Sequence, residues 1–174
     1  MAGTAARYRG RSVLPVPSVP IVEYRRTFEF PVSPADMWTA IEDSEVFEAW
    51  WPWLREFTIV GGSLRAGSVM KGVVVPPIPY RMRIEIDLVR CRRPHLIDAA
   101  VHGDLEGEAE LRFRRSEIGT RAEVSWRLEM MQRPMRIANR VARPLLVRAH
   151  DAVVEVTVSS FRRHLVASRG QARR

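Results

Sequence analysis

The stretch Ala122-Glu-Val-Ser-Trp-Arg-Leu-Glu-Met130 alternates apolar and polar residues and leads almost directly into a helical segment from about residue 134 to residue 168. Two earlier stretches, residues 80–88 and 105–113, alternate in the same way. Apolar residues at every second position predict strands of a sheet that has one buried and one solvated face. The apolar face needs a cover, and only the C-terminal helix is long enough to supply it.

Other local signals place the remaining elements along the chain. Residues 23–30 are predicted to form the first strand, and Ser33 and Pro34 suit the N-cap and first position of a helix that ends near Glu42. A second short helix is expected from residue 44 to residue 50, before Pro52. Further strands are expected near residues 55–61, 68–75, 80–90, 95–102, 105–114 and 121–131, between turns that contain Gly or Pro.

The chain of 174 residues is long enough for one domain with a substantial core. We assign residues 1–22 to a poorly ordered arm, residues 23–168 to a single domain and residues 169–174 to a basic tail. The single cysteine, Cys91, excludes an internal disulfide and fits a reducing compartment. No apolar run approaches the ~20 residues of a membrane span, and we find no secretory signal. These features predict a cytoplasmic protein.

The net charge of +8 raises the question of nucleic-acid binding. Residues 1–22 and 162–174 contain eight arginines and no acidic residue, whereas residues 23–161 hold equal numbers of basic and acidic residues. A nucleic-acid-binding domain would carry a basic face on the fold itself. We therefore expect no nucleic-acid partner, and binding of an anionic surface through the basic ends is kept as an alternative function.

The C-terminal helix has an apolar face made mostly of small residues. At about 100° per residue, this face carries Ala138, Ala142, Leu145, Ala149, Ala152, Val153, Val156 and Ser160. Small residues here mean either close packing of helix on sheet or room for a ligand, and the sequence leaves both open. Pro144 removes one backbone hydrogen bond and should kink the helix or start a new segment.

The order of these elements resembles the START-like, Bet v 1-like (SRPBCC) helix-grip superfamily, and within it the bacterial polyketide cyclase/dehydrase-type group. The likeness covers residues 23–166 and rests on Phe30-Pro-Val-Ser-Pro-Ala-Asp-Met-Trp38, Glu48-Ala-Trp-Trp-Pro-Trp53, His102-Gly-Asp-Leu-Glu-Gly107 and Arg148-Ala-His-Asp151. The resemblance implies an α+β fold with a curved antiparallel sheet of about seven strands wrapped around a long C-terminal helix, and two short helices after the first strand. Members of the superfamily bind or carry hydrophobic molecules or act as aromatases and cyclases, so the fold alone does not give the function.

His150 is the candidate catalytic residue. It lies at the edge of the inward helix face and matches a His-Asp step that the resemblance places in this helix. The alternative is a structural histidine, satisfied by a backbone group or by solvent at the flank of the helix. Asp151 is the next residue, so we expect its side chain to point away from His150. The four scattered histidines and one cysteine lack the spacing of a zinc site, and we expect no metal and no cofactor.

The other candidate ligand-binding residues are large apolar or aromatic side chains of the predicted interior. Trp50 and Trp53 lie where the resembled fold has its cavity entrance, and they either contact a ligand or fill the junction between helix and sheet. The remaining candidates are Tyr80, Met82, Ile84, Trp126, Leu145, Ala149 and Val153. We predict that Met82, Ile84, Leu111, Val124 and Trp126 are buried against Leu145, Ala149 and Val153.

The sequence therefore predicts a domain that binds a small hydrophobic molecule, aromatic, polyketide-like or lipid, in a cavity between the sheet and the C-terminal helix. The enzymatic alternative is a cofactor-independent cyclase, aromatase or dehydratase that uses general acid–base chemistry in that cavity. The sequence does not choose between a monomer and a homodimer.

Overall fold

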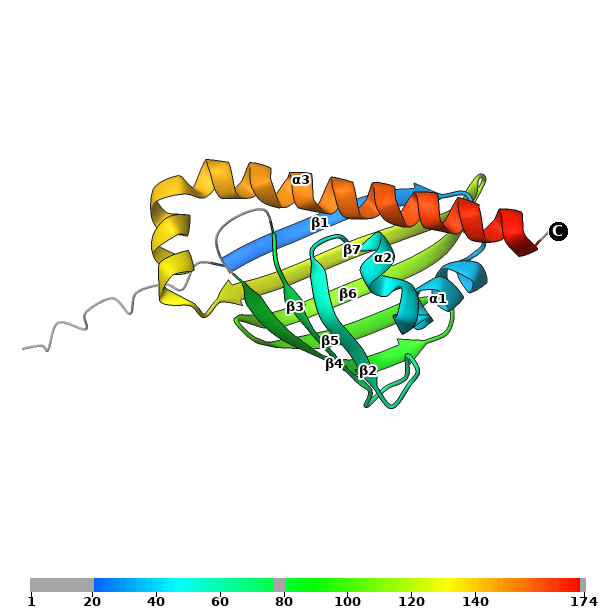
Figure 1. Ribbon diagram of the computed structural model, residues 1–174, viewed down its shortest axis with the longest axis horizontal. Coiled ribbons are helices and arrows are strands. Elements are labelled where there is room, and N and C mark those ends of the chain that lie inside the picture. The colour runs from blue at the N-terminus through cyan, green and yellow to red at the C-terminus, as the bar shows by residue number, and fades with distance from the viewer. Residues whose placement is uncertain (1–20, 77–80, 173–174) are drawn as a thin grey trace, which may run out of the picture.

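The structure, a computed structural model that describes residues 21–76 and 81–172, is a curved sheet with helices on its inner side (Figure 1). The strands are β1 (Ile21–Phe30), β2 (Leu54–Val60), β3 (Val69–Val74), β4 (Met82–Arg92), β5 (Leu96–Gly103), β6 (Leu105–Ser116) and β7 (Gly119–Met130). They form one antiparallel sheet in the order β1-β7-β6-β5-β4-β3-β2. The predicted α+β helix-grip fold is confirmed.

The helices follow the predicted order. α1 (Pro34–Glu42) comes after β1, η1 (Ser44–Val46) and α2 (Phe47–Trp50) replace the single second helix that we expected, and α3 (Arg133–Ala172) follows β7. Ser33 is the N-cap of α1, because its hydroxyl accepts a hydrogen bond from the Asp36 backbone amide at 3.2 Å. The predicted arm lies outside the described residues, except for Ile21 and Val22, which belong to β1.

Cross-strand partners show which side chains share the inner face of the sheet. Tyr24 of β1 pairs with Trp126 of β7, and Phe30 pairs with Thr120. Because partners in register project to the same side, Arg26, between Tyr24 and Phe30, also belongs to the inner face. α3 packs over this face: the rings of Phe30 and Phe161 lie 5.7 Å apart, and the guanidinium of Arg162 donates to the Glu29 carbonyl at 3.1 Å.

Buried side chains cover the inner face at one end of the sheet, which we call the closed end. There α1, α2 and the C-terminal half of α3 come together (Figure 1). Large side chains from all three helices pack on inner-face residues of the strands, and the buried cluster includes Trp38, Phe47, Trp50, Leu54, Leu88, Phe113, Phe161 and Leu165. This cluster is the hydrophobic core that holds the helices on the sheet.

α3 is interrupted at Ala142, whose φ of −123° and ψ of 27° are not helical, two residues before Pro144. The predicted kink is therefore confirmed, and Figure 1 shows the segment before it (yellow) turned sharply away from the long segment that follows. The helix ends at Ala172, beyond the predicted end at Ser168, so the predicted basic tail is largely helical.

The kink also explains why the predicted inward face of α3 is wrong in part. Leu145 is 67% exposed, and Ala152 and Val156 are exposed as well. The side of α3 that is half-buried or buried instead carries His150, Val153, Thr157, Phe161 and Leu165. The predicted face extends one helical phase from Ala138 through Ala142, but the helix bends at Ala142, so that phase does not apply to the segment that follows.

Candidate functional site

Away from the closed end, the side chains of the inner face are less buried. Met82 and Ile84 of β4 and Val124, Trp126 and Leu128 of β7 point to the same side as the core, yet each remains half-buried and none belongs to the buried cluster. Ala149 and Val153 of α3 are half-buried too. We call this region, together with Tyr24 and His150, the open end. The prediction that Met82, Ile84, Leu111, Val124 and Trp126 are buried against α3 is wrong in two respects. All five strand residues are only half-buried, and Leu145 of α3 is exposed.

Aromatic rings converge at the open end around His150. The rings of Tyr24 and Trp126 are stacked with centroids 4.3 Å apart. The imidazole of His150 meets both edge-on, with centroids 5.0 Å from Tyr24 and 5.4 Å from Trp126. β1, β7 and α3 therefore contribute one ring each to a single cluster. The stacked rings of Tyr24 and Trp126 offer a flat aromatic surface, and the imidazole of His150 offers nitrogens that can take up a proton.

Asp151 and Arg26 extend this cluster into a row of polar side chains. Nδ1 of His150 lies 3.6 Å from Oδ1 of Asp151, and Oδ2 of Asp151 lies 3.8 Å from the Arg26 guanidinium. The expectation that Asp151 points away from His150 is therefore wrong. Adjacent helical residues diverge by ~100° at the backbone, but both side chains turn toward the edge of β1, where Arg26 offers a positive charge.

Burial sets the protonation of the two polar ring groups. It lowers the pKa of His150 below the ordinary value of 6.5, and the nearby carboxylate of Asp151 opposes this shift only in part. Burial raises the pKa of the Tyr24 hydroxyl. At neutral pH the site thus presents an uncharged imidazole and an uncharged phenol.

The remaining predicted residues fall in different places. Trp50 is 6% exposed and packs against Phe161 and Phe47, with ring centroids 4.5 and 4.6 Å away. It fills the junction between helix and sheet at the closed end, which was the alternative to ligand contact. Trp53 is half-buried just before β2. Tyr80 lies outside the described residues.

Sequence reasoning missed Tyr24 and Arg26. The alternation along β1 could have found them. Every second residue of the strand points to the same face, and Phe30 is buried. The inner face of β1 therefore carries Tyr24, Arg26, Phe28 and Phe30. An arginine on an apolar face of an edge strand has a counterion only if another element supplies one, and here α3 supplies Asp151.

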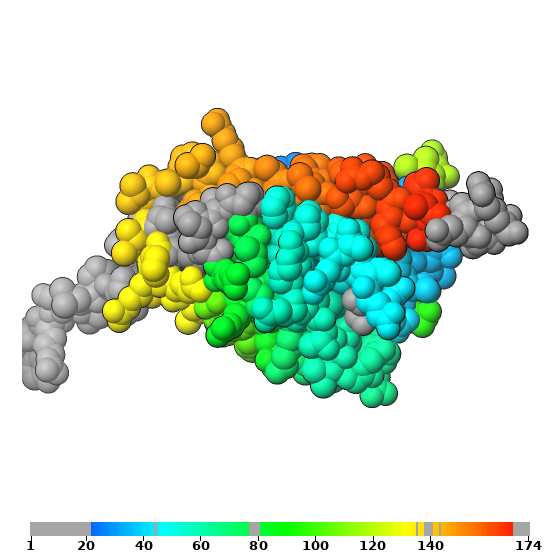
Figure 2. Space-filling model, in the orientation of Figure 1, coloured from blue at the N-terminus to red at the C-terminus, as the bar shows by residue number. Residues whose placement is uncertain are grey.

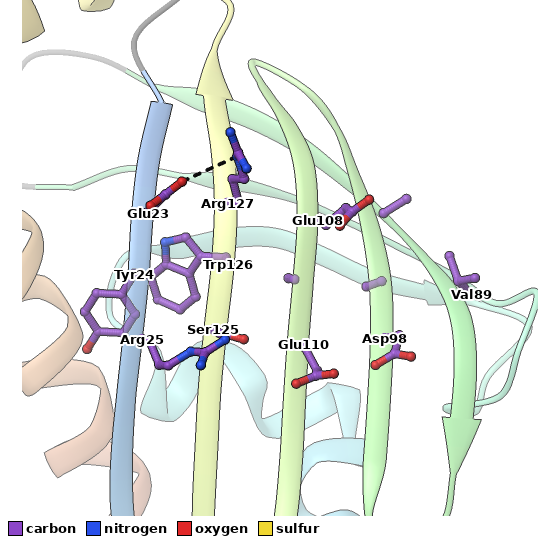
Figure 3. A pocket seen from close by; sticks show the side chains of 13 residues that line it. Glu23, Tyr24, Arg25, Val89, Asp98, Glu108, Glu110, Ser125, Trp126 and Arg127 are labelled. Carbon is purple, nitrogen blue, oxygen red and sulfur yellow. Dashed lines mark ion pairs between the residues drawn. The ribbon is translucent and has the colours of Figure 1, made fainter.

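One hollow of about 800 Å³ is lined mostly by outer-face side chains of β1, β7, β6 and β5 (Figure 3). Figure 3 shows Glu23 beside Arg127, and these two side chains lie 3.5 Å apart. Asp98 binds Arg90 at 2.6 Å, and the bidentate Arg112 holds the pKa of Glu110 below its ordinary range. This surface carries solvated side chains in ion pairs. It agrees with the solvated outer face that the alternation predicts, and it does not suit an apolar ligand.

A curved antiparallel sheet closed by a long C-terminal helix defines the helix-grip class of α+β domains. The chain belongs to the family described as polyketide cyclase / dehydrase and lipid transport, whose model matches residues 22–166. No curated protein sequence matches the chain significantly. Within residues 21–76 and 81–172, no helix combines the length and apolar character that crossing a bilayer requires.

Solved structures share the fold at low sequence identity. The Thermus thermophilus protein TTHA0849 is 18% identical, with a TM-score of 0.65, over 86% of this chain and 99% of its own. Ara h 8.0201 is 13% identical with a TM-score of 0.61, over 85% of this chain and 99% of its own. The di-domain ARO/CYC StfQ from the steffimycin biosynthetic pathway is 11% identical with a TM-score of 0.65, over 86% of this chain and 52% of its own.

Proposed function

We propose that the domain binds a small hydrophobic molecule, aromatic, polyketide-like or lipid, at the open end between the sheet and α3. The observation that carries this proposal is the incomplete burial of large apolar side chains on a face that a helix covers. Half-buried apolar surface under such a cover is surface that a ligand can still remove from water. The proposed walls are Tyr24, Met82, Ile84, Trp126, Ala149, His150 and Val153.

The polar row gives the proposed ligand an orientation. A flat apolar body would lie against Trp126 and Tyr24, and a polar group at one end would face His150 or the Arg26–Asp151 pair. The membership in a family of cyclases and lipid carriers supports a ligand of this mixed character. The half-exposed Arg26 favours an oxygen-rich end group over a purely hydrocarbon one.

A pair of matched substitutions on α3 tests the location. Val153→Phe places a larger ring at the half-buried inner face, and Val156→Phe makes the same change at an exposed position of the same helix. We expect Val153→Phe to weaken binding of an apolar fluorescent probe, anilinonaphthalene sulfonate, by about tenfold or more and Val156→Phe to leave it unchanged. Equal affinities in both variants would refute the proposed location. Native mass spectrometry of the freshly purified protein would identify a co-purifying molecule.

His150 supports a second candidate function, a cofactor-independent cyclase or dehydratase. An imidazole that burial keeps neutral, with a carboxylate 3.6 Å from its Nδ1, is suited to accept a proton from an acidic carbon of a bound polyketone. Replacing His150 with Gln should then lower turnover of a polyketone substrate by roughly 10²-fold while binding persists. If the wild-type protein binds such a substrate and converts none of it, the enzymatic candidate fails and the binding function stands.

A further inference from the structure

The N-terminal part of α3 differs from the rest of the domain in charge. Residues 133–148 contain Arg133, Arg136, Arg140, Arg143 and Arg148 and no acidic residue. Residues 23–161 are neutral as a whole, so this segment concentrates positive charge that acidic residues elsewhere in this range balance. Arg133 and Arg148 are exposed and Arg136 is half-buried.

The same segment exposes apolar side chains. Ile137 is 64% exposed and Val141 is 82% exposed, and Leu145 and Val147 are also exposed. Met131, just before the segment, is exposed too. Half of the large apolar side chains that are exposed in the described part of the chain lie between residues 131 and 147. Isolated exposed apolar residues are ordinary on protein surfaces, but a group of them within one short segment marks an interaction surface.

The fold makes a projecting corner of this segment. Because α3 breaks at Ala142, residues 133–141 run in a different direction from the rest of the helix. Figure 1 shows this stretch (yellow) at the end of the molecule opposite α1, and the yellow atoms of Figure 2 lie at the same end. The start of the corner is tied to the sheet, since the Met131 amide donates to the Asp104 carbonyl at 3.0 Å and the Gln132 side chain donates to the Arg81 carbonyl at 3.1 Å.

We propose that this corner, residues 131–148, docks on the surface of an anionic lipid bilayer. Arginines attract anionic headgroups and bind phosphates in a bidentate manner, and exposed Ile, Val and Leu side chains enter the boundary between headgroups and acyl chains. A basic segment with exposed apolar residues and no acidic residue has the chemistry of an interfacial helix. A nucleic acid would match the charge but would leave the apolar side chains without a partner.

Docking of the corner would place the open end next to the bilayer. This part of the proposal rests on the proposed function, binding of an apolar ligand at the open end. Met130 ends β7 at the open end, and the corner begins at the next residue. An apolar ligand could therefore pass between bilayer and inner face without crossing bulk water, which removes the hydrophobic cost of that step.

Co-sedimentation of the full chain with vesicles tests the docking. The vesicles contain phosphatidylcholine alone or phosphatidylcholine with about one third phosphatidylserine. We expect binding to the anionic vesicles that weakens as salt increases. The double variant Arg133→Gln/Arg136→Gln should bind about 30-fold more weakly, since each arginine near the surface contributes a factor of about five. The control Arg65→Gln/Arg92→Gln removes the same charge from exposed positions outside α3 and should bind as the wild type does.

A second pair separates apolar contact from charge. Ile137 and Ile118 are 64% and 62% exposed, so Ile137→Ser and Ile118→Ser remove the same side chain at nearly the same exposure. Ile137→Ser should weaken vesicle binding by about fivefold and Ile118→Ser should not. The proposal is overturned if both double variants lose binding equally, if no vesicle binds, or if the corner variants instead break up a dimer. Probe binding measured on the same variants should be unchanged, so a failure of docking is distinguishable from a failure of ligand binding.

Discussion

The closed and open ends of the sheet share the same strands and the same alternating pattern, but different helical residues cover them. At the closed end, Trp38, Phe47 and Phe161 reach the strands and leave Leu88 and Phe113 nearly inaccessible. At the open end α3 presents Ala149, His150 and Val153 to strand residues that stay half-buried. One amphipathic sheet thus supplies both a dry core and a candidate site, and the size of the covering side chains separates the two.

The comparison implies that the two ends contribute differently to the free energy of unfolding. Tight packing makes the loss of a side chain costly at the closed end because a cavity remains. At the open end the surroundings are already accessible, and less is lost. Backbone geometry is constrained at both ends by strand pairing. At the open end, where side chains pack less tightly, we expect changes of backbone geometry to lower the free energy of unfolding more than the loss of a side chain does.

Gly107 should show the largest effect, and it lies at the open end. It pairs with Leu128 at a φ of 150°, and a Cβ here would overlap the Arg127 carbonyl oxygen. Gly107→Ala should lower the free energy of unfolding by about 4 kcal/mol, since a backbone atom cannot rotate away. Gly62→Ala is the control, because Gly62 has a φ of 70° but open space around it, and it should cost about 1 kcal/mol. Urea unfolding measures both, and equal losses would contradict the steric argument.

Two leucines on the inner face compare the ends directly. Leu88 is 2% exposed in the closed-end cluster, and Leu128 is half-buried at the open end. Leu88→Ala should cost about 3 kcal/mol and Leu128→Ala about 1 kcal/mol in urea unfolding. Leu128→Ala should also change the affinity for the apolar probe, whereas Leu88→Ala should not. Similar stability losses in the two variants would show that the open end is packed as tightly as the closed end.

The pH dependence of stability should give the smallest effect. Because the pKa of His150 is lowered in the folded protein, the unfolded chain binds this proton more readily. The contribution of His150 to stability is therefore complete above pH 6.5 and is lost as the pH falls through 6.5 toward the folded pKa. His150→Gln should remove this part of the decline in urea unfolding measured from about pH 7 to about pH 5. Asp151→Asn should deepen the decline, because the Asp151 carboxylate raises the pKa of His150. A wild-type profile that matches the Gln variant would contradict the burial of a neutral imidazole.

The predictability of the site differed from residue to residue. Trp126 and Val124 followed from strand alternation, and the structure places both on the inner face. The exposure of Leu145 was not predicted, because its expected direction assumed one continuous helix through Ala142, where the helix bends. Tyr24 and Arg26 were readable from the parity of β1, but nothing local indicated that Asp151 would meet Arg26 from an element more than a hundred residues away.

The sequence by itself determined the strands and their two faces, the capped start of α1, the break near Pro144 and the helix-grip order of elements. Each of these depends on residues close together in the chain, whose periodicity and backbone preferences act locally. Only the tertiary structure decided which half of the inner face is filled and which stays half-buried, and only it joined Tyr24, Trp126, His150, Asp151 and Arg26 into one cluster. Burial depends on which side chains of a distant helix lie above a strand. Local periodicity carries no information about the size of those side chains or about the direction of the helix after a kink.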